Sequence, residues 1–598
     1  MSALCPKPIR LYPVIILITL LSTGCQPSVK NHQAEAPPNI ILIVADDQGW
    51  GDLSLTGNPV VETPYLDSLA RQGAFFENFY VSAVCSPTRA ELLTGRYAVR
   101  GGVYSTSAGG ERLDLDEITF AQILQDAGYR TGAFGKWHNG MQPPYHPNAR
   151  GFDEFYGYCS GHWGSYFDAE LEHNGQIVQS EGFLTDVLTD RAMAFIDEHQ
   201  QEPFLVYLPL NTPHSPMQVP DRWWKKFESM ELPQHRYRER EDLDHSRAAY
   251  AMAENIDWNV GRLTRHLAEL GLDERTVVVY LSDNGPNGWR WNAGMEGIKG
   301  SVDEGGLKSP LIVHWPAHVS PGLQVDAIAS SLDLFPTLLE IANIQAPESL
   351  SVDGNSLFPL LGPEDSVSWP GRTLVSHWRE QTSVRTQRFR LNDAGQLFDL
   401  EADPGQTRDV AAQYPEVRDQ MSQTRLNWRE TVLTELPSED LRPFPVGHPS
   451  FSHTQLPARD AVAHGNLQRS NRWPNCSFFT NWTSEADSLT WEVEVLTEGE
   501  YEVVVYYTGD SATIGTELAV SFRGEHTGAS ILEAHTPPLR GMEHDRIPRG
   551  ESYVKEFAPL ALGSLFLSKG PGPLTLTTPK LASNQGPDIR RVMLWRKN

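Results

Sequence analysis

Helix-like and strand-like patterns alternate along the first half of the chain, and this alternation limits the folds that it can adopt. Asn39–Ala45 is a continuous apolar run rich in β-branched residues, as in a strand that is buried on both faces. The pattern predicts an α/β fold with a large mixed, mainly parallel sheet sandwiched between helices. Four later strand-like runs each follow a helix-like run: Ala74–Val81 after Pro64–Gln72, Tyr129–Phe134 after Ile118–Ala127, Pro203–Leu208 after Asp186–His199, and Thr276–Ser282 after Ser246–Leu270.

Polar and charged residues come soon after these predicted strands, where the ligands of such sheets gather. Asp46 and Asp47 directly follow the first strand. Two adjacent carboxylates at the end of a buried strand are costly unless a cation or a hydrogen-bond donor faces them, although a solvated turn is the plainer alternative. The other candidates at strand ends are Lys136, His138, His214, Asp283 and Asn284, and Lys299 and Glu304 follow on a later loop.

A cysteine stands at a predicted strand-to-helix junction, in the sequence Cys85-Ser86-Pro87-Thr88-Arg89. Pro87 suits the first turn of a helix, where a missing N–H loses no intrahelical hydrogen bond. Arg89, one turn beyond the cysteine, would lie on the same helix face, beside free N–H groups that favour an anion. These residues indicate an anion site, and they are also compatible with an ordinary helix start that holds a buried cysteine.

The motifs resemble those of one enzyme family when they are taken in order. Cys85–Arg89 resembles the C-x-P-x-R core of the type I, formylglycine-dependent sulfatases of the alkaline-phosphatase superfamily. Gly135–Gly140 resembles the family's G-K-W-H-x-G, and Lys299–Gly306 resembles its K-G-x-x-x-E-G-G. The resemblance extends over roughly residues 39–435. It implies that a sulfatase-maturating enzyme oxidises Cys85 to formylglycine (3-oxoalanine), whose hydrated aldehyde attacks sulfur.

The resemblance also implies a metal site. Its ligands would be Asp46, Asp47, Asp283 and Asn284, together with the modified residue at Cys85. Hard oxygen ligands suit Ca²⁺ and, less well, Mg²⁺. A bound cation would polarise a sulfate oxygen and help to activate the attacking hydroxyl.

Five further residues take catalytic roles through the same resemblance. Arg89, Lys136 and Lys299 would offset the negative charge of the sulfate as the transition state forms. His138 would contact the formylglycine hydroxyl and assist breakdown of the covalent intermediate. His214 would protonate the leaving sugar oxygen, which requires a pKa near the working pH.

Two loops carry aromatic residues that suit sugar recognition. Trp289, Arg290 and Trp291 follow the predicted metal ligands in a glycine-rich loop, and His162 lies in a second aromatic cluster. Aromatic faces stack on sugar rings, and arginine pairs with a sulfate or a carboxylate. The alternative is that these side chains only pack the loops.

The N-terminus reads as a targeting segment. Two basic residues precede the short apolar stretch Leu11–Leu21, and Ser22–Cys25 resembles a bacterial lipobox. We expect a lipoprotein signal peptide at residues 1–24, acylation (palmitate) at Cys25 and a tether at residues 25–37. The protein would then be exported and lipid-anchored to the bacterial cell envelope, in the outer membrane and facing the periplasm or the surface. A plain secretory signal is the alternative.

Two cysteines, Cys159 and Cys476, have no role in these assignments. In an oxidising compartment they would be able to form a disulfide. Two separate buried thiols are the alternative, and sequence does not decide between them.

The second half of the chain changes in character. We expect a catalytic domain at residues 38–372 and a small α+β C-terminal subdomain at 373–436, followed by a proline-rich linker at 437–454. Residues 455–598 have alternating strand patterns with turns between them, which predict an all-β sandwich. This last domain would be either carbohydrate-binding-like or a structural appendage. Its strand-like runs are Leu489–Val495, Gly499–Tyr507, Glu517–Phe522 and Leu574–Thr578.

Charge and length limit the function. A formal net charge of −27 over 598 residues argues against a nucleic-acid partner, and an anionic substrate would need a locally positive pocket. The expected function is calcium-dependent hydrolysis of sulfate esters on a sulfated polysaccharide or its oligosaccharides. The alternatives are a phosphoester or phosphonate hydrolase of the same superfamily and an inactive glycan-binding surface lipoprotein.

Overall fold

The computed structural model describes Ser2 and residues 37–362, 369 and 371–597. The predicted signal peptide at 1–24, the acylated Cys25 and almost all of the predicted tether lie outside these residues. Among the helices that are described, none has both the length and the apolar character needed to cross a bilayer.

The centre of the fold is a sheet of eleven strands. Its middle strand β1 (Asn39–Asp46) is buried at every residue, and it lies parallel to β7 (Phe204–Pro213) on one side and β8 (Thr276–Ser282) on the other. Most pairings are parallel, which confirms the predicted sheet. The order is β10-β2-β9-β8-β1-β7-β3-β4-β5-β6, and β11 also pairs with β2. The remaining strands are β2 (Ala74–Tyr80), β3 (Arg130–Lys136), β4 (Glu154–Tyr158), β5 (Glu170–His173), β6 (Gln176–Gln179), β9 (Lys308–His314), β10 (Leu323–Val325) and β11 (Ala329–Ser330).

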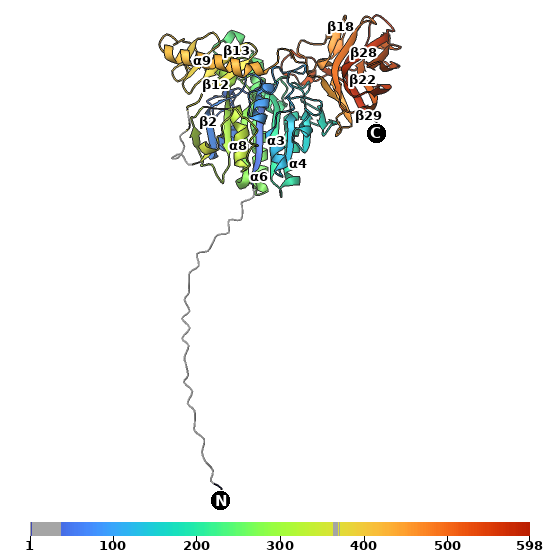
Figure 1. Cartoon of the computed structure of the whole chain (residues 1–598). Helices are drawn as coiled ribbons and strands as arrows, with labels where there is room; N and C mark the ends of the chain where they lie inside the picture. The colour runs from blue at the N-terminus through green and yellow to red at the C-terminus, as the bar shows by residue number, and fades with distance from the viewer. Residues whose placement is uncertain (1, 3–36, 363–368, 370, 598) are drawn as a thin grey trace. The chain divides into compact units, whose positions relative to one another are not determined.

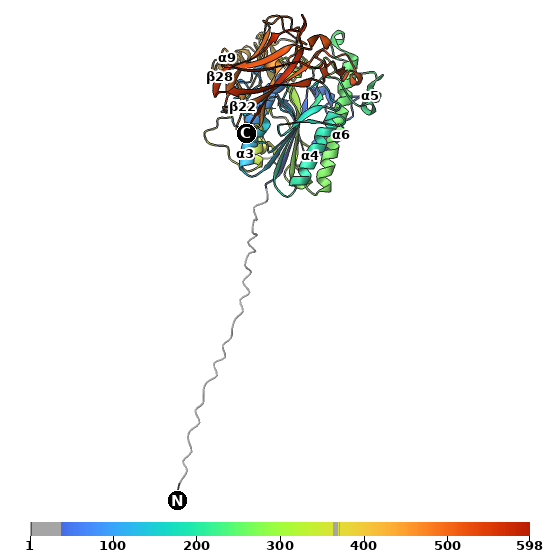
Figure 2. The same cartoon turned by 90° about the vertical axis from the view of Figure 1, so that its right-hand side faces the viewer.

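Helices cover both faces of this sheet because alternate residues of β1 point to opposite sides. Ile41 and Ile43 join one hydrophobic core with helices α1, α4 and α6, whereas Ile40 and Leu42 join a second core with α2, α3 and α8. Figure 2 shows α4 and α6 together on one side of the strands and α3 on the other. These helices are α1 (Pro64–Gln72), α2 (Cys85–Thr94), α3 (Phe120–Asp126), α4 (Leu184–His199), α6 (Leu243–Glu269) and α8 (Leu334–Ile341); α5 (Asp221–Phe227) packs on α6, and α7 (Glu304–Leu307) precedes β9.

The predicted C-terminal subdomain is an antiparallel sheet with one helix. Strands β12 to β15 pair in chain order, and α9 (Pro415–Thr431) contributes Met421 and Trp428 to a shared core with Val384 and Leu391. Figure 1 shows α9 next to β12 and β13. The strands are β12 (Leu374–Trp378), β13 (Gln381–Arg385), β14 (Phe389–Leu391) and β15 (Leu397–Asp399).

The C-terminal region contains the predicted sandwich of two main sheets. Inward residues of both sheets, such as Trp491, Val503 and Val592, form one hydrophobic core. The first sheet comprises β16 (Phe444–Val446), β18 (Val462–His464), β21 (Ser488–Val495), β23 (Glu517–Phe522), β24 (Glu525–Ser530) and β28 (Gly570–Lys580); the second comprises β17 (His453–Pro457), β19 (Gln468–Arg469), β20 (Phe479–Thr480), β22 (Gly499–Thr508), β27 (Ala558–Leu567) and β29 (Asp588–Arg596); β25 (Leu539–Arg540) pairs with β26 (Val554–Lys555).

The predicted linker at 437–454 differs from what the structure shows. Its residues Phe444 and Val446 lie in β16, which pairs with β21 and joins the sandwich core. Because β16 is an edge strand, it tolerates Pro445, so a proline-rich sequence concealed a strand. From residue 37 onward, the described part of the chain forms one compact unit.

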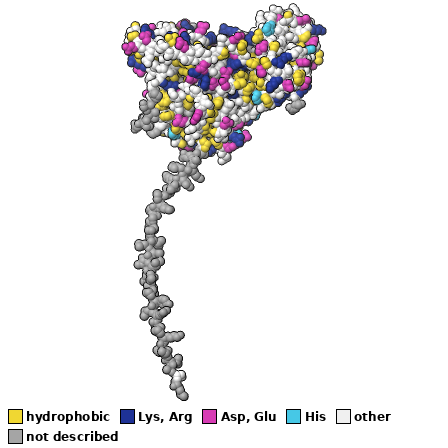
Figure 3. Space-filling view, in the orientation of Figure 1, with side chains coloured by type: hydrophobic (Ala, Val, Ile, Leu, Met, Phe, Trp, Pro, Cys, Tyr) yellow, Lys and Arg dark blue, Asp and Glu magenta, His cyan; other side chains and the backbone are white. Residues whose placement is uncertain are grey.

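The net charge of −27 is not collected in one acidic area of the visible surface. Figure 3 shows basic and acidic side chains interspersed over that face. Local charge at the pocket therefore matters more for substrate binding than the total charge does.

Candidate active site

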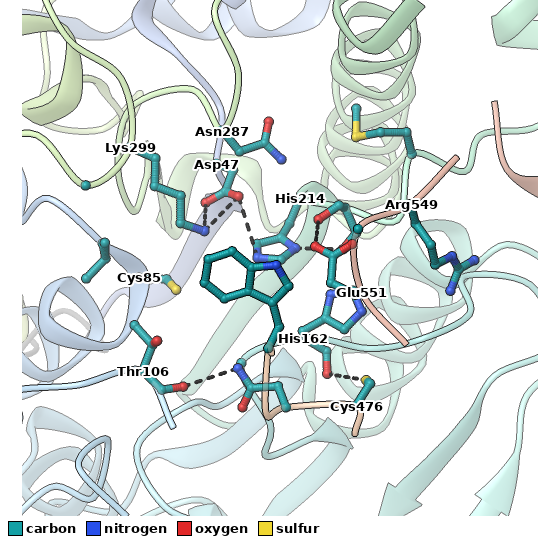
Figure 4. A pocket seen from close by; sticks show the side chains of 18 of the residues that line it. Asp47, Cys85, Thr106, His162, His214, Asn287, Lys299, Cys476, Arg549 and Glu551 are labelled. Atoms are coloured by element: carbon teal, nitrogen blue, oxygen red, sulfur yellow. Dashed lines mark hydrogen bonds and ion pairs between the residues drawn. The ribbon is translucent and has the colours of Figure 1, made fainter. Parts of the chain in front are cut away.

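A cavity of about 660 Å³ lies where the carboxyl ends of the central strands meet the start of α2. The predicted residues Asp47, Cys85, His138, His214 and Lys299 line it, and Figure 4 shows four of them around one space. The remaining predicted residues are buried below them: Asp46, Arg89, Lys136, Asp283 and Asn284. The structure thus brings together all ten residues that the resemblance implied.

Helix α2 begins at Cys85, and its preceding residue Val84 has extended backbone angles. Pro87 is the third residue of the helix, where its missing N–H costs no hydrogen bond. Arg89 follows one turn later and donates to the Lys136 carbonyl oxygen over 2.9 Å, which joins α2 to the end of β3. The cysteine is thereby fixed at a helix N-terminus that faces the pocket.

Three buried carboxylates each have a cationic partner. The Lys136 Nζ lies 2.7 Å from Asp46 Oδ2, and the Arg89 Nη2 lies 2.6 Å from Asp283 Oδ2. The Lys299 Nζ lies 2.6 Å from Asp47 Oδ1. Buried carboxylates of this kind require such pairing, since an unpaired buried charge is strongly destabilising.

Glycine permits this arrangement at one position. Gly135, just before Lys136, has a φ of 138°, and a Cβ atom there would lie 1.9 Å from the Pro209 carbonyl oxygen. A larger residue would separate β3 from β7. Gly135 of the G-K-W-H-x-G sequence therefore allows β3 to lie close to β7, and Lys136 follows it at the end of β3.

The donor set fits a divalent cation. Asp46 Oδ1 and Asn284 Oδ1 are buried acceptors with no hydrogen-bond partner among the described residues. Ligand atoms of Asp46, Asp283 and Cys85 lie within 4.8 Å of one another, as do those of Asp46, Asp47 and His214. Buried oxygens without donors are rare in folded proteins, and hard oxygens suit Ca²⁺ or Mg²⁺.

The pKa values of the two adjacent aspartates move in opposite directions. Burial, together with the neighbouring Asp283, raises the pKa of Asp46 well above its ordinary value, despite Lys136. Burial also opposes ionisation of Asp47, but Lys299 and His214 outweigh it and lower its pKa. A cation bound between these groups would favour the charged form of Asp46.

Two of the histidines that line the pocket, His138 and His214, are held by carbonyl groups. His138 Nε2 lies 2.9 Å from the Thr106 oxygen, and His214 Nδ1 lies 2.6 Å from the Ser215 oxygen. Burial and nearby lysines lower the pKa of both imidazoles well below the ordinary value. In a neutral imidazole, donation to these carbonyls leaves His138 Nδ1 and His214 Nε2 as acceptors.

The predicted sugar-binding residues separate into two groups. His162 lines the pocket, its ring lies 5.5 Å from that of His214, and both its ring nitrogens are buried without a partner in the described structure. Arg290 is fully buried and donates to Asp52 through Nε over 2.8 Å.

The two tryptophans of the same loop also lie away from the pocket lining. Trp289 packs its ring 5.0 Å from His235 and 5.4 Å from Tyr237. Trp291 packs so close to Gly51 that a Cβ atom there would meet its backbone and ring. For Trp289, Arg290 and Trp291 the structure shows the packing alternative.

Comparison with known proteins settles the family. A sequence model described as Sulfatase matches residues 38–344, about half of the chain. This chain belongs to the sulfatase family. A second model, described as N-sulphoglucosamine sulphohydrolase, C-terminal, matches residues 299–431. The protein is accordingly a sulfuric ester hydrolase, as the motifs predicted.

Several relatives resemble this sulfatase over most of their own length. The N-acetylgalactosamine-6-sulfatase of Mus musculus is 32% identical over 60% of this chain and 71% of the relative. The arylsulfatase A of Homo sapiens is 32% identical over 65% of this chain and 87% of the relative. The crystal structure of Ps i-CgsB in complex with k-i-k-neocarrahexaose has a TM-score of 0.60 and 30% identity, covering 67% of this chain and 94% of that one.

The pocket of this sulfatase contains residues that sequence reasoning missed. His245 stands in the first turn of α6, one residue before the predicted helix-like run Ser246–Leu270, and we had given it no role. Burial lowers its pKa to about 4. Asn287 lies only three residues after the predicted ligand Asn284, in the glycine-rich loop where we singled out the aromatic residues and Arg290 instead. Other lining residues come from segments far along the chain that no sequence signal joined to the site, and they include Trp378, Arg379, Trp473, Asn475 and Glu551.

The two unassigned cysteines of the sulfatase are separate. Cys159 and Cys476 are both buried free thiols, so the disulfide alternative is wrong. The Cys476 Sγ donates to the His162 carbonyl oxygen over 3.3 Å. This contact places a cysteine from the sandwich beside a residue of the catalytic pocket.

Proposed function

We propose that this sulfatase hydrolyses sulfate esters on a sulfated polysaccharide or its oligosaccharides, with Ca²⁺ as metal and a formylglycine at position 85. The observation that carries the proposal is the position of Cys85. It lies at the pocket end of α2, next to buried oxygen ligands and three buried or half-buried cations. An ordinary helix start would not need this combination of charges.

Asp46, Asp47, Asp283 and Asn284 would hold the cation. Two of them already present buried oxygens without a partner among the described residues. Bound Ca²⁺ would withdraw electrons from a sulfate oxygen, which offsets the negative charge on the sulfate oxygens and makes sulfur more electrophilic. Ca²⁺ suits the site better than Mg²⁺ because it accepts carboxylate-rich, irregular shells.

The residue at position 85 would supply the attacking oxygen once it is oxidised to formylglycine. Cys85 is only 2% exposed, so the folded protein would not present it to a maturating enzyme. The oxidation would therefore take place before the chain folds around this residue. Its neighbour Arg89 lies beneath it and binds Asp283 rather than the pocket. Arg89 therefore holds the carboxylate in place and adds positive potential below the sulfate.

Lys299 and His214 would act on the sulfate and on the leaving group. Asp47 raises the pKa of Lys299 despite its burial, so this ammonium group stays charged and available at the pocket wall. The sulfate's negative charge would favour protonation of His214, which then would give its proton to the leaving sugar oxygen. His138, oriented by the Thr106 carbonyl, would accept a proton at Nδ1.

A glycan substrate is supported by the pocket and by the relatives. A cavity of about 660 Å³ accommodates more than one sugar ring. A relative that is 32% identical is named N-acetylgalactosamine-6-sulfatase, and the structure with 30% identity holds a neocarrahexaose. We further propose export and a lipid anchor at Cys25, on the strength of the lipobox-like sequence Ser22–Cys25.

The test measures sulfate and phosphate release by matured wild-type protein and by Cys85→Ala. The substrates are sulfated algal and animal glycans, their oligosaccharides, a small aryl sulfate and phosphoesters. Peptide mass first establishes that residue 85 is converted. We expect sulfate release that is lost in Cys85→Ala. Release of phosphate in preference to sulfate would instead support the phosphoesterase alternative, and glycan binding without any release would support an inactive binding protein.

A further inference from the structure

Two loops of the C-terminal sandwich border the catalytic pocket. Residues 473–476 lie between β19 and β20, and residues 547–551 lie between β25 and β26. Figure 4 shows Cys476, Arg549 and Glu551 beside His162 and His214. Neither family model reaches beyond residue 431, so the family resemblance gives these loops no role.

Buried polar contacts fix the first loop to the catalytic domain. The Arg459 Nη1 donates to Ser160 Oγ over 2.6 Å and to Asn475 Oδ1 over 2.7 Å. The Asn475 Nδ2 in turn donates to the Thr106 oxygen over 3.2 Å. Thr106 is also the partner of His138, so the sandwich is connected to the catalytic centre through one carbonyl group.

The second loop is fixed in a similar way. Arg549 forms a buried ion pair with Asp545, its Nε lying 2.8 Å from Oδ2. The Gln218 Nε2 of the catalytic domain donates to Asp545 Oδ1 over 2.8 Å and to the Gly541 oxygen over 2.7 Å. Buried hydrogen bonds and an ion pair therefore hold both loops in place as parts of the pocket wall.

Glu551 places a carboxylate next to the leaving-group side of the pocket. Its Oε1 accepts from Ser215 Oγ over 2.6 Å, one residue from His214. Burial opposes its ionisation, but His162 and the Ser215 hydroxyl lower its pKa, so the group is charged at neutral pH. An anion here would repel sulfate, whereas it accepts strong hydrogen bonds from sugar hydroxyls.

Trp473 offers an aromatic surface on the same wall. Its side chain is 48% exposed although it lines the cavity. An exposed indole at a pocket is suited to stacking on a sugar ring, and it loses little conformational entropy when a ring binds. His162 adds two buried ring nitrogens that lack partners among the described residues.

We propose that the sandwich completes the substrate pocket, with Trp473 stacking on a sugar ring and Glu551 accepting hydrogen bonds from its hydroxyl groups. This inference rests on the proposed function, because it concerns the glycan of the same site. The Glu551 carboxylate also selects against a second anionic substituent at that position. The appended domain is then a specificity element of the active site.

The experiment uses the full, matured chain and compares two substrates. These are the oligosaccharide that wild-type protein cleaves fastest and a small aryl sulfate that is too short to reach the sandwich wall. Trp473→Ala and Glu551→Gln should each lower kcat/KM on the oligosaccharide by about tenfold, mainly through KM, and change the aryl sulfate rate by less than about twofold. Glu551→Gln should also improve relative activity on an oligosaccharide with an additional sulfate.

The matched controls are Phe566→Ala and Glu533→Gln, which alter exposed residues of the same domain outside the pocket lining. Both should retain wild-type rates. Equal losses on the oligosaccharide and the aryl sulfate would assign Trp473 and Glu551 a merely structural role and overturn the proposal. Unchanged rates on the oligosaccharide would also overturn the proposal.

Binding separates this proposal from the proposed function. Cys85→Ala protein should bind members of the glycan panel, and adding Trp473→Ala should weaken that binding by about tenfold. If wild-type protein releases no sulfate but Cys85→Ala binds glycan through Trp473, the proposed reaction fails and the sugar site stands. Absence of glycan binding overturns the sugar site.

Discussion

His138 and Asn475 donate hydrogen bonds to the same carbonyl oxygen, that of Thr106, over 2.9 and 3.2 Å. The first residue follows strand β3 of the catalytic sheet, and the second belongs to the C-terminal sandwich. A substitution in the sandwich loop would therefore alter the orientation of the His138 imidazole through this shared acceptor.

Asn475→Ala should lower kcat about tenfold on the oligosaccharide and on the small aryl sulfate, with KM nearly unchanged. The variant removes a donor from Thr106 and an acceptor from Arg459, which loosens the group that orients His138. Steady-state kinetics with both substrates checks this. Asn466→Ala, an exposed change in the same domain, is the control, and unaltered kcat in Asn475→Ala would show that Thr106 orients His138 without help.

Removal of Ca²⁺ with a chelator should abolish sulfate release and lower the melting temperature, and Ca²⁺ should restore both more fully than Mg²⁺. The physical reason is the set of buried acceptors at Asp46 and Asn284 that have no donor in the described structure. Metal-dependent stabilisation should also appear in Cys85→Ala, for which we expect no sulfate release, and it should weaken in Asn284→Leu. A melting temperature independent of Ca²⁺ would contradict the proposed metal site.

Arg290→Ala should destabilise the protein by about 3–5 kcal/mol, because it leaves the buried Asp52 carboxylate without its partner. KM of the folded fraction should change little, since Arg290 does not line the pocket itself and supports it only from behind, through hydrogen bonds to the Asp47 carbonyl oxygen over 3.2 Å and to Asn287 Oδ1 over 3.3 Å. Urea unfolding and kinetics together test this. The double variant Arg290→Met with Asp52→Leu should be less destabilised than the single one, and a raised KM in Arg290→Ala would restore the sugar-binding hypothesis.

Glu304→Gln should alter how stability depends on pH. Glu304 accepts from Arg390 Nη2 over 2.9 Å and ties the Lys299 loop to the subdomain. Although burial opposes its charge, Arg385 and Arg390 lower its pKa from 4.5 to about 2.

The lowered pKa of Glu304 determines the direction in which stability changes with pH. Above pH 4.5 the carboxylate is ionised in both states and its stabilisation is complete; as pH falls toward 2, the unfolded chain takes up a proton first and stability is lost. Glu304→Gln should therefore be less stable at pH 7 and show a flatter pH dependence between these values. Urea midpoints at several pH values measure it, with Glu348→Gln, an exposed carboxylate, as control. Parallel curves for wild type and Glu304→Gln would contradict the assignment.

The sequence by itself determined the central sheet, and its motifs, through the family resemblance, predicted the ten residues that the structure brings together. Asn39–Ala45 is apolar at every residue but the first, which predicts a strand buried on both faces, and parallel strands bring their carboxyl ends to one edge. Asp46 and Asp283 were therefore expected at the same edge of the sheet, and the pairing of β1 with β8 in the structure makes their strands neighbours. Local pattern carried this information for the residues that come soon after strand ends, whereas Cys85, Arg89 and Lys299 were assigned through the family motifs.

Only the tertiary structure determined which residues form the pocket wall. Trp289, Arg290 and Trp291 stand near the metal ligands in sequence, yet Arg290 turns inward to Asp52, because burial of a charge depends on a partner 238 residues away. Trp473 and Glu551 reach the pocket through loops of a separate sandwich, and Phe444 joins that sandwich from a proline-rich stretch. Contacts between distant segments depend on packing and paired charges, which no local pattern encodes.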